Sequence, residues 1–142
     1  MFGAIKDICD NAKKLDINSM MRTIILDPTV QAQLIDLNLA QMDAGINAKG
    51  VTMPNYSRAS VEKYGKTPGP FTLKDTGDTR NSMFVSVQGD GFTMNADTGL
   101  HGVDLSELFD PSLGETPESI EEIKPEITER LRDKILSNLL NR

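Results

Sequence analysis

Residues 83–96 read MFVSVQGDGFTMNA, two runs of alternating apolar and polar residues on either side of a Gly-Asp-Gly turn. Side chains of a β-strand point alternately to its two faces, so Met83, Val85 and Val87 are expected to share one face. The second run places its apolar residues on one face in the same way: Phe92, Met94 and Ala96. The pattern predicts a β-hairpin that turns at residues 89–91.

Helical spacing of apolar residues predicts helices on the N-terminal side of this hairpin. Residues 1–26 form an N-terminal helical segment of one or two short helices, with Asp16 or Asn18 as the cap of the second. A longer amphipathic helix is expected to begin at Asp27-Pro28 and to continue to about Ile46, because Asp caps helices and Pro is tolerated at the first position. Its apolar residues predict a broad buried face: Val30, Leu34, Ile35, Leu37, Leu39, Met42 and Ile46.

On the C-terminal side, Thr116-Pro117-Glu118 is expected to begin a C-terminal helix over residues 116–142. The helix carries one apolar stripe: Ile120, Ile123, Ile127, Leu131, Ile135, Leu136, Leu139 and Leu140. Proline lacks the amide that a helix interior needs, so we expect a kink or break at Lys124 with Pro125 as the first residue of the terminal helix. A shorter helical turn is expected at Leu105, Leu108 and Phe109 before Pro111. Helices, one hairpin and helices again predict a single α+β domain over residues 1–142.

Turn-forming residues replace the helical pattern over residues 47–70, which we interpret as a long loop. Loops of this length in compact domains are usually functional or become ordered on a partner. Ser57 is positioned to cap a single helical turn within the loop. The β-hairpin region then covers residues 71–98, where residues 71–74 fit either a short strand or an extended segment and Thr76 fits the cap of a one-turn helix.

Charge is distributed unevenly along the 142 residues, whose net charge is −6. Residues 104–126 hold eight acidic side chains and one basic one, a net charge of −7, whereas residues 46–80 hold six basic and three acidic ones, a net charge of +3. The overall acidity disfavours binding of nucleic acid through bulk charge. We therefore interpret the acidic stretch as an interface or channel surface.

The residue types that catalysis requires are scarce. The single cysteine, Cys9, lies at helical spacing from Ile5 and is expected to be a small buried or half-buried thiol, and the single histidine, His101, has no evident catalytic partner. Asp75-Thr76-Gly77 matches the letters of an aspartic-protease loop, but that chemistry needs a second aspartate, which only a symmetric dimer would supply. Asp75, Asp78, Asp90 and Asp97 could supply oxygen ligands to a divalent ion, but their spacing does not match a calcium loop, and solvated turn carboxylates are the expected role. We therefore expect no enzyme, no cofactor and no metal.

No apolar segment of the sequence approaches the length needed to cross a bilayer, and the N-terminus lacks the apolar core of a signal peptide. These features predict a protein without a membrane partner, located inside the cell or in an assembly built there.

Several stretches read together resemble one family: residues 45–50, Tyr56-Ser57, FTLKDTGD at 71–78 running into NSMFV at 81–85, Leu108-Phe109 and TPES at 116–119. Over roughly residues 28 to 140, the chain resembles small virion-morphogenesis or tail-completion proteins of tailed phages and prophages, including crAss-like phages. The resemblance implies a non-enzymatic virion protein of the neck or tail top, in a homo-oligomeric ring of six or twelve copies that joins the portal to adjacent tail proteins. DNA would pass through such a ring without sequence-specific binding.

Charge asymmetry suggests how copies would contact one another in such a ring. Head-to-tail contacts join two different patches of the same chain, so the acidic stretch of one copy is expected to meet the basic segment of the next. The expected interface residues are Lys49, Arg58, Lys63, Lys66, Glu118, Glu121 and Glu122. The alternative function is a stand-alone adaptor or inhibitor domain that binds one protein partner through loop 47–70.

Overall fold

The structure is a computed structural model that describes residues 2–72, 78–97, 99–100, 103–104 and 113–141. Within these residues the predicted α+β class is confirmed, with an antiparallel hairpin, a second very short strand pair and a long C-terminal helix. The elements in chain order are α1 (Phe2–Lys13), α2 (Ile17–Ile25), α3 (Pro28–Asp43), α4 (Arg58–Tyr64), α5 (Asp78–Asn81), β1 (Phe84–Gln88), β2 (Gly91–Asn95), β3 (Gly99–Leu100), β4 (Val103–Asp104) and α7 (Pro117–Leu140).

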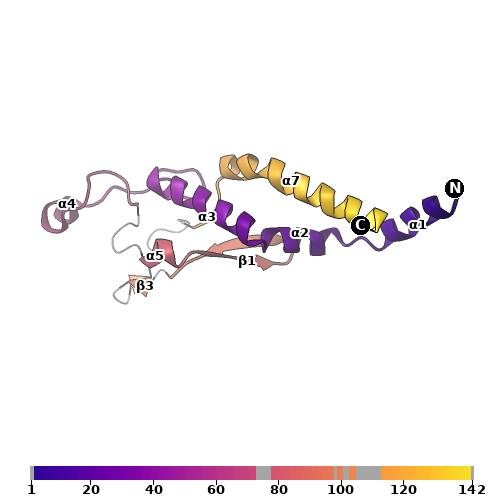
Figure 1. Ribbon diagram of the computed structural model, residues 1–142. Coiled ribbons are helices and arrows are strands. Elements are labelled where there is room, and N and C mark those ends of the chain that lie inside the picture. The colour runs from indigo at the N-terminus through magenta and orange to yellow at the C-terminus, as the bar shows by residue number, and fades with distance from the viewer. Residues whose placement is uncertain (1, 73–77, 98, 101–102, 105–112, 142) are drawn as a thin grey trace.

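The molecule is elongated (Figure 1). Its middle is formed by α2, α3, α7 and the β1–β2 hairpin, which contact one another. One tip carries α4, and the opposite tip carries α1 beside the last turns of α7. The two tips therefore present surfaces from different parts of the chain.

Helix starts follow the local sequence as predicted. Asp16 caps α2 by accepting from the Ser19 amide at 3.0 Å, and Asp27 caps α3 by accepting from the Thr29 amide at 2.9 Å. Thr116 caps α7 and Ser57 caps α4 in the same way. Helix α3 ends at Asp43, three residues before the predicted end.

The break predicted at Lys124 is wrong, because α7 continues without interruption through Pro125 from Pro117 to Leu140. Proline at this position removes one hydrogen bond, the one that would reach the carbonyl of residue 121. Glu121 and Pro125 are both exposed on α7, so that carbonyl lies on the solvent side of the helix, where losing the bond costs least.

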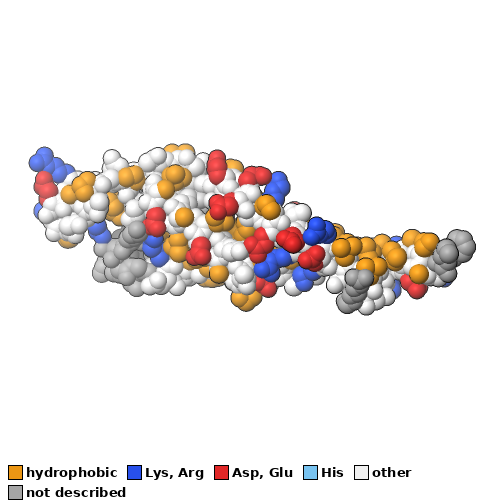
Figure 2. Space-filling model, turned by 45° about the horizontal axis from the view of Figure 1, so that its top comes forward, with side chains coloured by type: hydrophobic (Ala, Val, Ile, Leu, Met, Phe, Trp, Pro, Cys, Tyr) orange, Lys and Arg blue, Asp and Glu red, His pale blue; other side chains and the backbone are white. Residues whose placement is uncertain are grey.

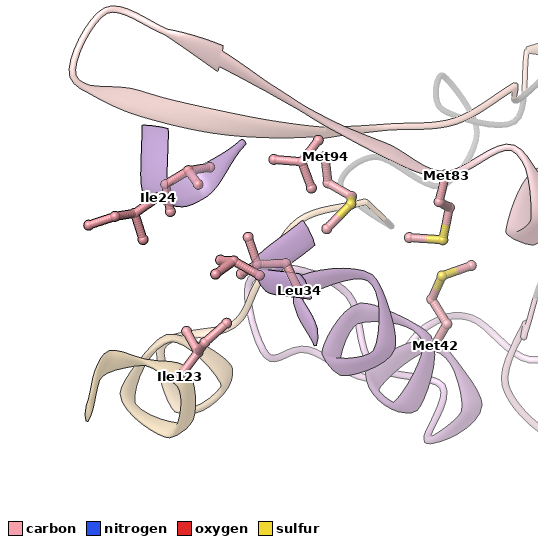
Figure 3. Packing of buried hydrophobic residues seen from close by; sticks show 9 residues of the cluster. Ile24, Leu34, Met42, Met83, Met94 and Ile123 are labelled. Carbon is pink, nitrogen blue, oxygen red and sulfur yellow. The ribbon is translucent and has the colours of Figure 1, made fainter. Parts of the chain in front are cut away.

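The β1–β2 hairpin pairs Val85 with Met94 and Val87 with Phe92, so the apolar face predicted from the alternation is confirmed. Val85 and Met94 are buried against the helices, together with Met83 just before β1. Figure 3 shows Met83 and Met94 pointing toward Leu34 and Met42 of α3, with Ile24 and Ile123 completing the cluster from α2 and α7. The core thus lies between one face of the hairpin and three helices.

Two buried polar residues of α3 attach the segment before α7 to this core. The Asn38 and Gln41 side-chain amides both donate to the Gly114 carbonyl oxygen at 2.9 Å, and the Gln41 oxygen accepts from the Thr116 amide at 3.0 Å. Burial of these side chains is compensated because each is hydrogen-bonded. The contacts fix where α7 begins relative to α3.

Candidate protein-interaction surfaces

Cys9 is free and exposed, so the predicted buried or half-buried position is wrong. Helix α1 packs mainly against the end of α7, which leaves the side carrying Cys9 open to solvent. Among the described residues, no group of three or more His, Cys, Asp or Glu side chains has the arrangement of a metal site. Residues 73–77 and His101, and with them the Asp75-Thr76-Gly77 motif, lie outside the described residues, as does the helical turn expected over 105–109.

Loop 47–70 is folded by contacts within the chain. Asn47 accepts from the amides of Lys49 and Val51, and the Tyr56 amide donates to the Gly69 carbonyl oxygen at 2.9 Å. The Tyr56 ring packs edge to face on Phe71, with 4.4 Å between the ring centroids. These contacts join the two arms of the loop and carry α4 to the tip of the molecule (Figure 1).

The root of the loop depends on one glycine and one arginine. Gly45 has a φ of +68°, and a Cβ atom there would lie 2.5 Å from Cβ of Pro70. Arg80 donates to the Thr72 carbonyl oxygen and forms a 2.7 Å ion pair with Asp43. A concavity of about 490 Å³ lies beside this root, with Asp43, Tyr56, Tyr64 and Lys66 in its wall.

The four basic interface residues predicted from the sequence all lie on this loop. Lys49, Arg58 and Lys63 are exposed, whereas Lys66 is partly buried with its Nζ 5.9 Å from the centroid of the Tyr56 ring. Arg58 also pairs with Glu62 in its own helix at 2.7 Å, which compensates part of its charge. The exposed positive charge on α4 therefore comes mainly from Lys63. Lys49 lies elsewhere on the loop, because its neighbour Ala48 packs beside Gly114, with 3.1 Å between the Ala48 Cβ and the position of a Cβ at Gly114.

The predicted acidic residues Glu118, Glu121 and Glu122 lie on the first turns of α7 and are all exposed. Glu121 forms an ion pair with Lys124 of the same helix at 3.0 Å. They belong to the middle of the molecule, whereas Arg58 and Lys63 lie on α4 at the tip (Figure 1). The structure leaves both groups accessible to other molecules.

Glu115, just before α7, is the acidic residue in the most unusual environment. Both carboxyl oxygens are buried without a hydrogen-bond partner among the described residues. Burial raises its pKa from 4.5 to about 7, and the nearby Ser119 hydroxyl, itself bonded to Thr116, opposes the rise. This carboxyl group is therefore not part of the exposed acidic surface.

The tip formed by α1 and α7 carries an apolar surface that the sequence analysis did not identify. Ile5 and Ile8 of α1 and Leu136 and Leu140 of α7 remain between 38% and 54% exposed, and we call these four residues the apolar arm. Figure 2 shows the apolar side chains gathered on this narrow end. The sequence did contain an indication of this surface. The apolar stripe of α7 extends well beyond Ile123, which is the one apolar residue that α7 contributes to the buried core.

A second apolar feature is a groove of about 630 Å³ between α2, the hairpin turn and α7. Its apolar lining includes Met21, Ile25, Phe92, Ile120 and Ile127. Arg22, Asp90, Glu121 and Lys124 supply its charged edge. Apolar concavities of this kind are typical of binding sites for side chains of a partner.

Comparisons with protein-family models, with curated proteins and with solved structures find no match to this chain. None of the described helices is both long enough and apolar enough to cross a membrane.

Proposed function

We propose that this chain is a structural, non-enzymatic component of the head–tail connector, or neck, of a tailed phage, or of its tail-completion ring. In this role it forms a homo-oligomeric ring of six or twelve copies that joins the portal to adjacent tail proteins, without a cofactor. Its place would be the virion neck or tail top, after assembly in the host cytoplasm. The resemblance of residues 71–85 to proteins of this class suggests the role.

The observation that carries the proposal is the presence of different exposed surfaces at the two ends of one elongated subunit. One end is the basic α4 loop, and the other is the apolar arm. Surfaces that differ in chemistry favour head-to-tail contacts, and such contacts produce a closed ring when the rotation between neighbours closes. Acidic residues of α7 that face the channel would repel packaged DNA and let it slide.

The ring itself is tested by native mass spectrometry of the purified full chain at low and high salt. We expect a closed oligomer, and we expect the double substitution of Glu121→Lys with Glu122→Lys to weaken it most at low salt. Glu129→Lys, on the same helix but outside the acidic stretch, is the matched control. If the double variant assembles as well as the control at every salt concentration, Glu121 and Glu122 are not part of the interface.

The virion role is tested in phage particles. We expect the chain in mass spectra of purified tailed particles and expect a stop codon in its gene to yield DNA-filled heads without attached tails. Infectious tailed particles that form without the chain would refute the connector role. Genes for a portal, a major capsid protein and a tail protein beside this gene would agree with it.

The alternative, an adaptor or inhibitor that binds one protein partner through loop 47–70, is favoured by two exposed apolar residues. Tyr64 is 75% exposed at the end of α4, and Val51 is 57% exposed. Tyrosine is among the residue types that contribute most binding energy at protein interfaces, so Tyr64 is the stronger of the two indications. An adaptor would be monomeric at every concentration, so the same mass measurement separates the two functions.

A further inference from the structure

A pocket of about 400 Å³ lies between α3 and α7. The described residues that line it are Gln33, Asp36, Leu37, Glu122, Ile123 and Glu126. Ile123 is buried in the core and Leu37 packs against it, whereas Asp36 and Glu122 are exposed. The pocket therefore has an apolar base and an acidic rim, and the three charged residues of its lining give a net charge of −3.

Most of this negative charge is not compensated within the chain. Arg130 binds Glu126 at 2.9 Å, but its guanidinium group also lies 3.5 Å from Asp27, so one positive charge is shared by two carboxylates. Asp36 and Glu122 have no ion-pair partner among the described residues. Carboxylates that border an apolar base are less screened by water than fully exposed ones, so the pocket attracts a cation.

Gln33 gives an independent indication that the pocket lacks a hydrogen-bond donor. Its Oε1 atom is buried and has no hydrogen-bond partner among the described residues. A buried acceptor without a donor destabilises the folded chain, and a donor that enters the pocket would remove this cost. The last torsion of a glutamine side chain has a broad energy minimum, so a small rotation turns the oxygen toward such a donor.

The shape and chemistry of the pocket indicate which kind of cation it takes. In the part of the chain that the structure describes, no three carboxylate, thiol or imidazole groups converge as ligands of one metal ion. A lysine or arginine side chain instead combines an aliphatic stem with a charged head that carries several N–H donors. The stem matches the apolar base, and the head matches the acidic rim and the oxygen of Gln33.

The acidic surface continues beyond the pocket, which suits a contact with a protein. Glu118 lies one helical turn before Glu122, on the same face of α7, and is exposed. A partner protein that inserts one basic side chain into the pocket would therefore meet further negative charge beside it.

We propose that the pocket between α3 and α7 is a docking site for a lysine or arginine side chain of a partner protein. The stem lies on Leu37 and Ile123, and the head binds Asp36 and Glu122 and donates to Oε1 of Gln33. The proposal rests on the proposed function for the kind of partner, because a connector subunit contacts other proteins.

The test is an NMR titration of the full-length chain with the tripeptide acetyl-Ala-Lys-Ala-amide. We expect saturable shifts of the Gln33 side-chain amide and of the backbone amides of Leu37 and Ile123, with a dissociation constant on the order of 1 mM. The same peptide with norleucine in place of lysine keeps the stem, lacks the ammonium group and should not bind. Absence of saturable shifts, or equal binding of the norleucine peptide, overturns the proposal.

Two double variants separate the pocket from the overall charge of the chain. Asp36→Asn with Glu122→Gln should weaken binding of the lysine peptide by roughly tenfold. Glu118→Gln with Glu129→Gln removes the same charge from exposed positions outside the pocket lining and should change binding little. Equal losses in the two double variants would show attraction by overall charge alone and overturn the site.

Gln33→Met keeps the size of the side chain and removes the acceptor. It should weaken peptide binding several-fold without lowering the midpoint of urea unfolding, because it also removes an unpaired buried oxygen. Unchanged peptide binding in this variant would contradict the placement of the charged head. Circular dichroism checks that every variant is folded.

Two further probes identify the source of the cation. n-Butylamine has the stem and head of lysine without a peptide backbone, and tighter binding of this amine than of the peptide would overturn a protein as the source. Saturable shifts of the same amides with magnesium chloride would identify a metal site and also overturn the proposal. Failure of the peptide to bind overturns this pocket alone, whereas the connector role is refuted only by the particle experiment.

Discussion

Replacing Glu115 by Gln should stabilise the protein at alkaline pH and change little at acidic pH. The folded chain buries both carboxyl oxygens of Glu115 without a hydrogen-bond partner among the described residues and raises the pKa from 4.5 to about 7. A carboxyl group with a raised pKa binds its proton more strongly in the folded state than in the unfolded state. Stability therefore falls as the pH rises from about 4.5 to 7, and the whole penalty is present above pH 7.

The size of the effect follows from the shift. A rise from 4.5 to about 7 corresponds to about 3 kcal/mol of unfolding free energy for a fully buried group. Glu115 is only partly buried and solvent screens part of the interaction, so we expect about 1 to 2 kcal/mol. Gln has nearly the same shape as Glu but no charge, so it removes the penalty without creating a cavity.

Urea unfolding at pH 5 and pH 8 measures the difference between the wild type and the variant. Other carboxylates titrate in both proteins, so the quantity of interest is how the stability gain of Glu115→Gln changes with pH. The gain should be small at pH 5 and about 1 to 2 kcal/mol at pH 8, whereas Glu118→Gln at an exposed position should show no such increase. A gain that is equal at both pH values, or larger at pH 5, would show that burial of Glu115 does not control its ionisation.

Three further substitutions test the packing by urea unfolding. Gly45→Ala should lower the free energy of unfolding by about 3 kcal/mol, because φ is +68° and the new Cβ would lie 2.5 Å from Cβ of Pro70. Gly50→Ala, at φ +76° with open space around it, should lower it only by the backbone strain of about 1 to 2 kcal/mol. Equal losses in the two variants would contradict the close approach to Pro70. Pro125→Ala should stabilise α7 by up to about 3 kcal/mol, and a loss of stability would mean that Pro125 makes a favourable contact. Asn38→Leu should lower the free energy of unfolding by about 2 kcal/mol, because it leaves the Gly114 amide without its hydrogen-bond acceptor. An unchanged midpoint of the urea transition would mean that this hydrogen bond does not stabilise the fold.

Local interactions explain why much of the fold was predictable from the sequence. A helix cap involves a side chain and an amide two or three residues away, so Asp27, Ser57 and Thr116 were predicted without any tertiary information, and Asp16 was one of two candidates. The hairpin register follows in the same way from alternation and a short turn.

Features that depend on distant contacts could not be predicted. Asn38 and Gln41 bind residues more than 70 positions away, and their polarity gave no reason to place them in the buried face of α3. The unbroken path of α7 through Pro125 depends on that residue facing solvent. Exposure of Cys9 depends on how little of α1 is covered, which the spacing of apolar residues does not reveal.

Some acidic residues of α7 are stabilised by contacts within the chain, whereas others are not. Glu118 lies in the first turn, where the helix dipole stabilises a negative charge, and Glu126 forms an ion pair with Arg130 at 2.9 Å. Glu121 has a local partner in Lys124, so reversing its charge also disrupts a contact within the helix. Glu122 has no ion-pair partner among the described residues and lies beyond the first turn. Reversing Glu122 therefore changes a surface charge without breaking an ion pair among the described residues, and it isolates the contribution of that charge to assembly.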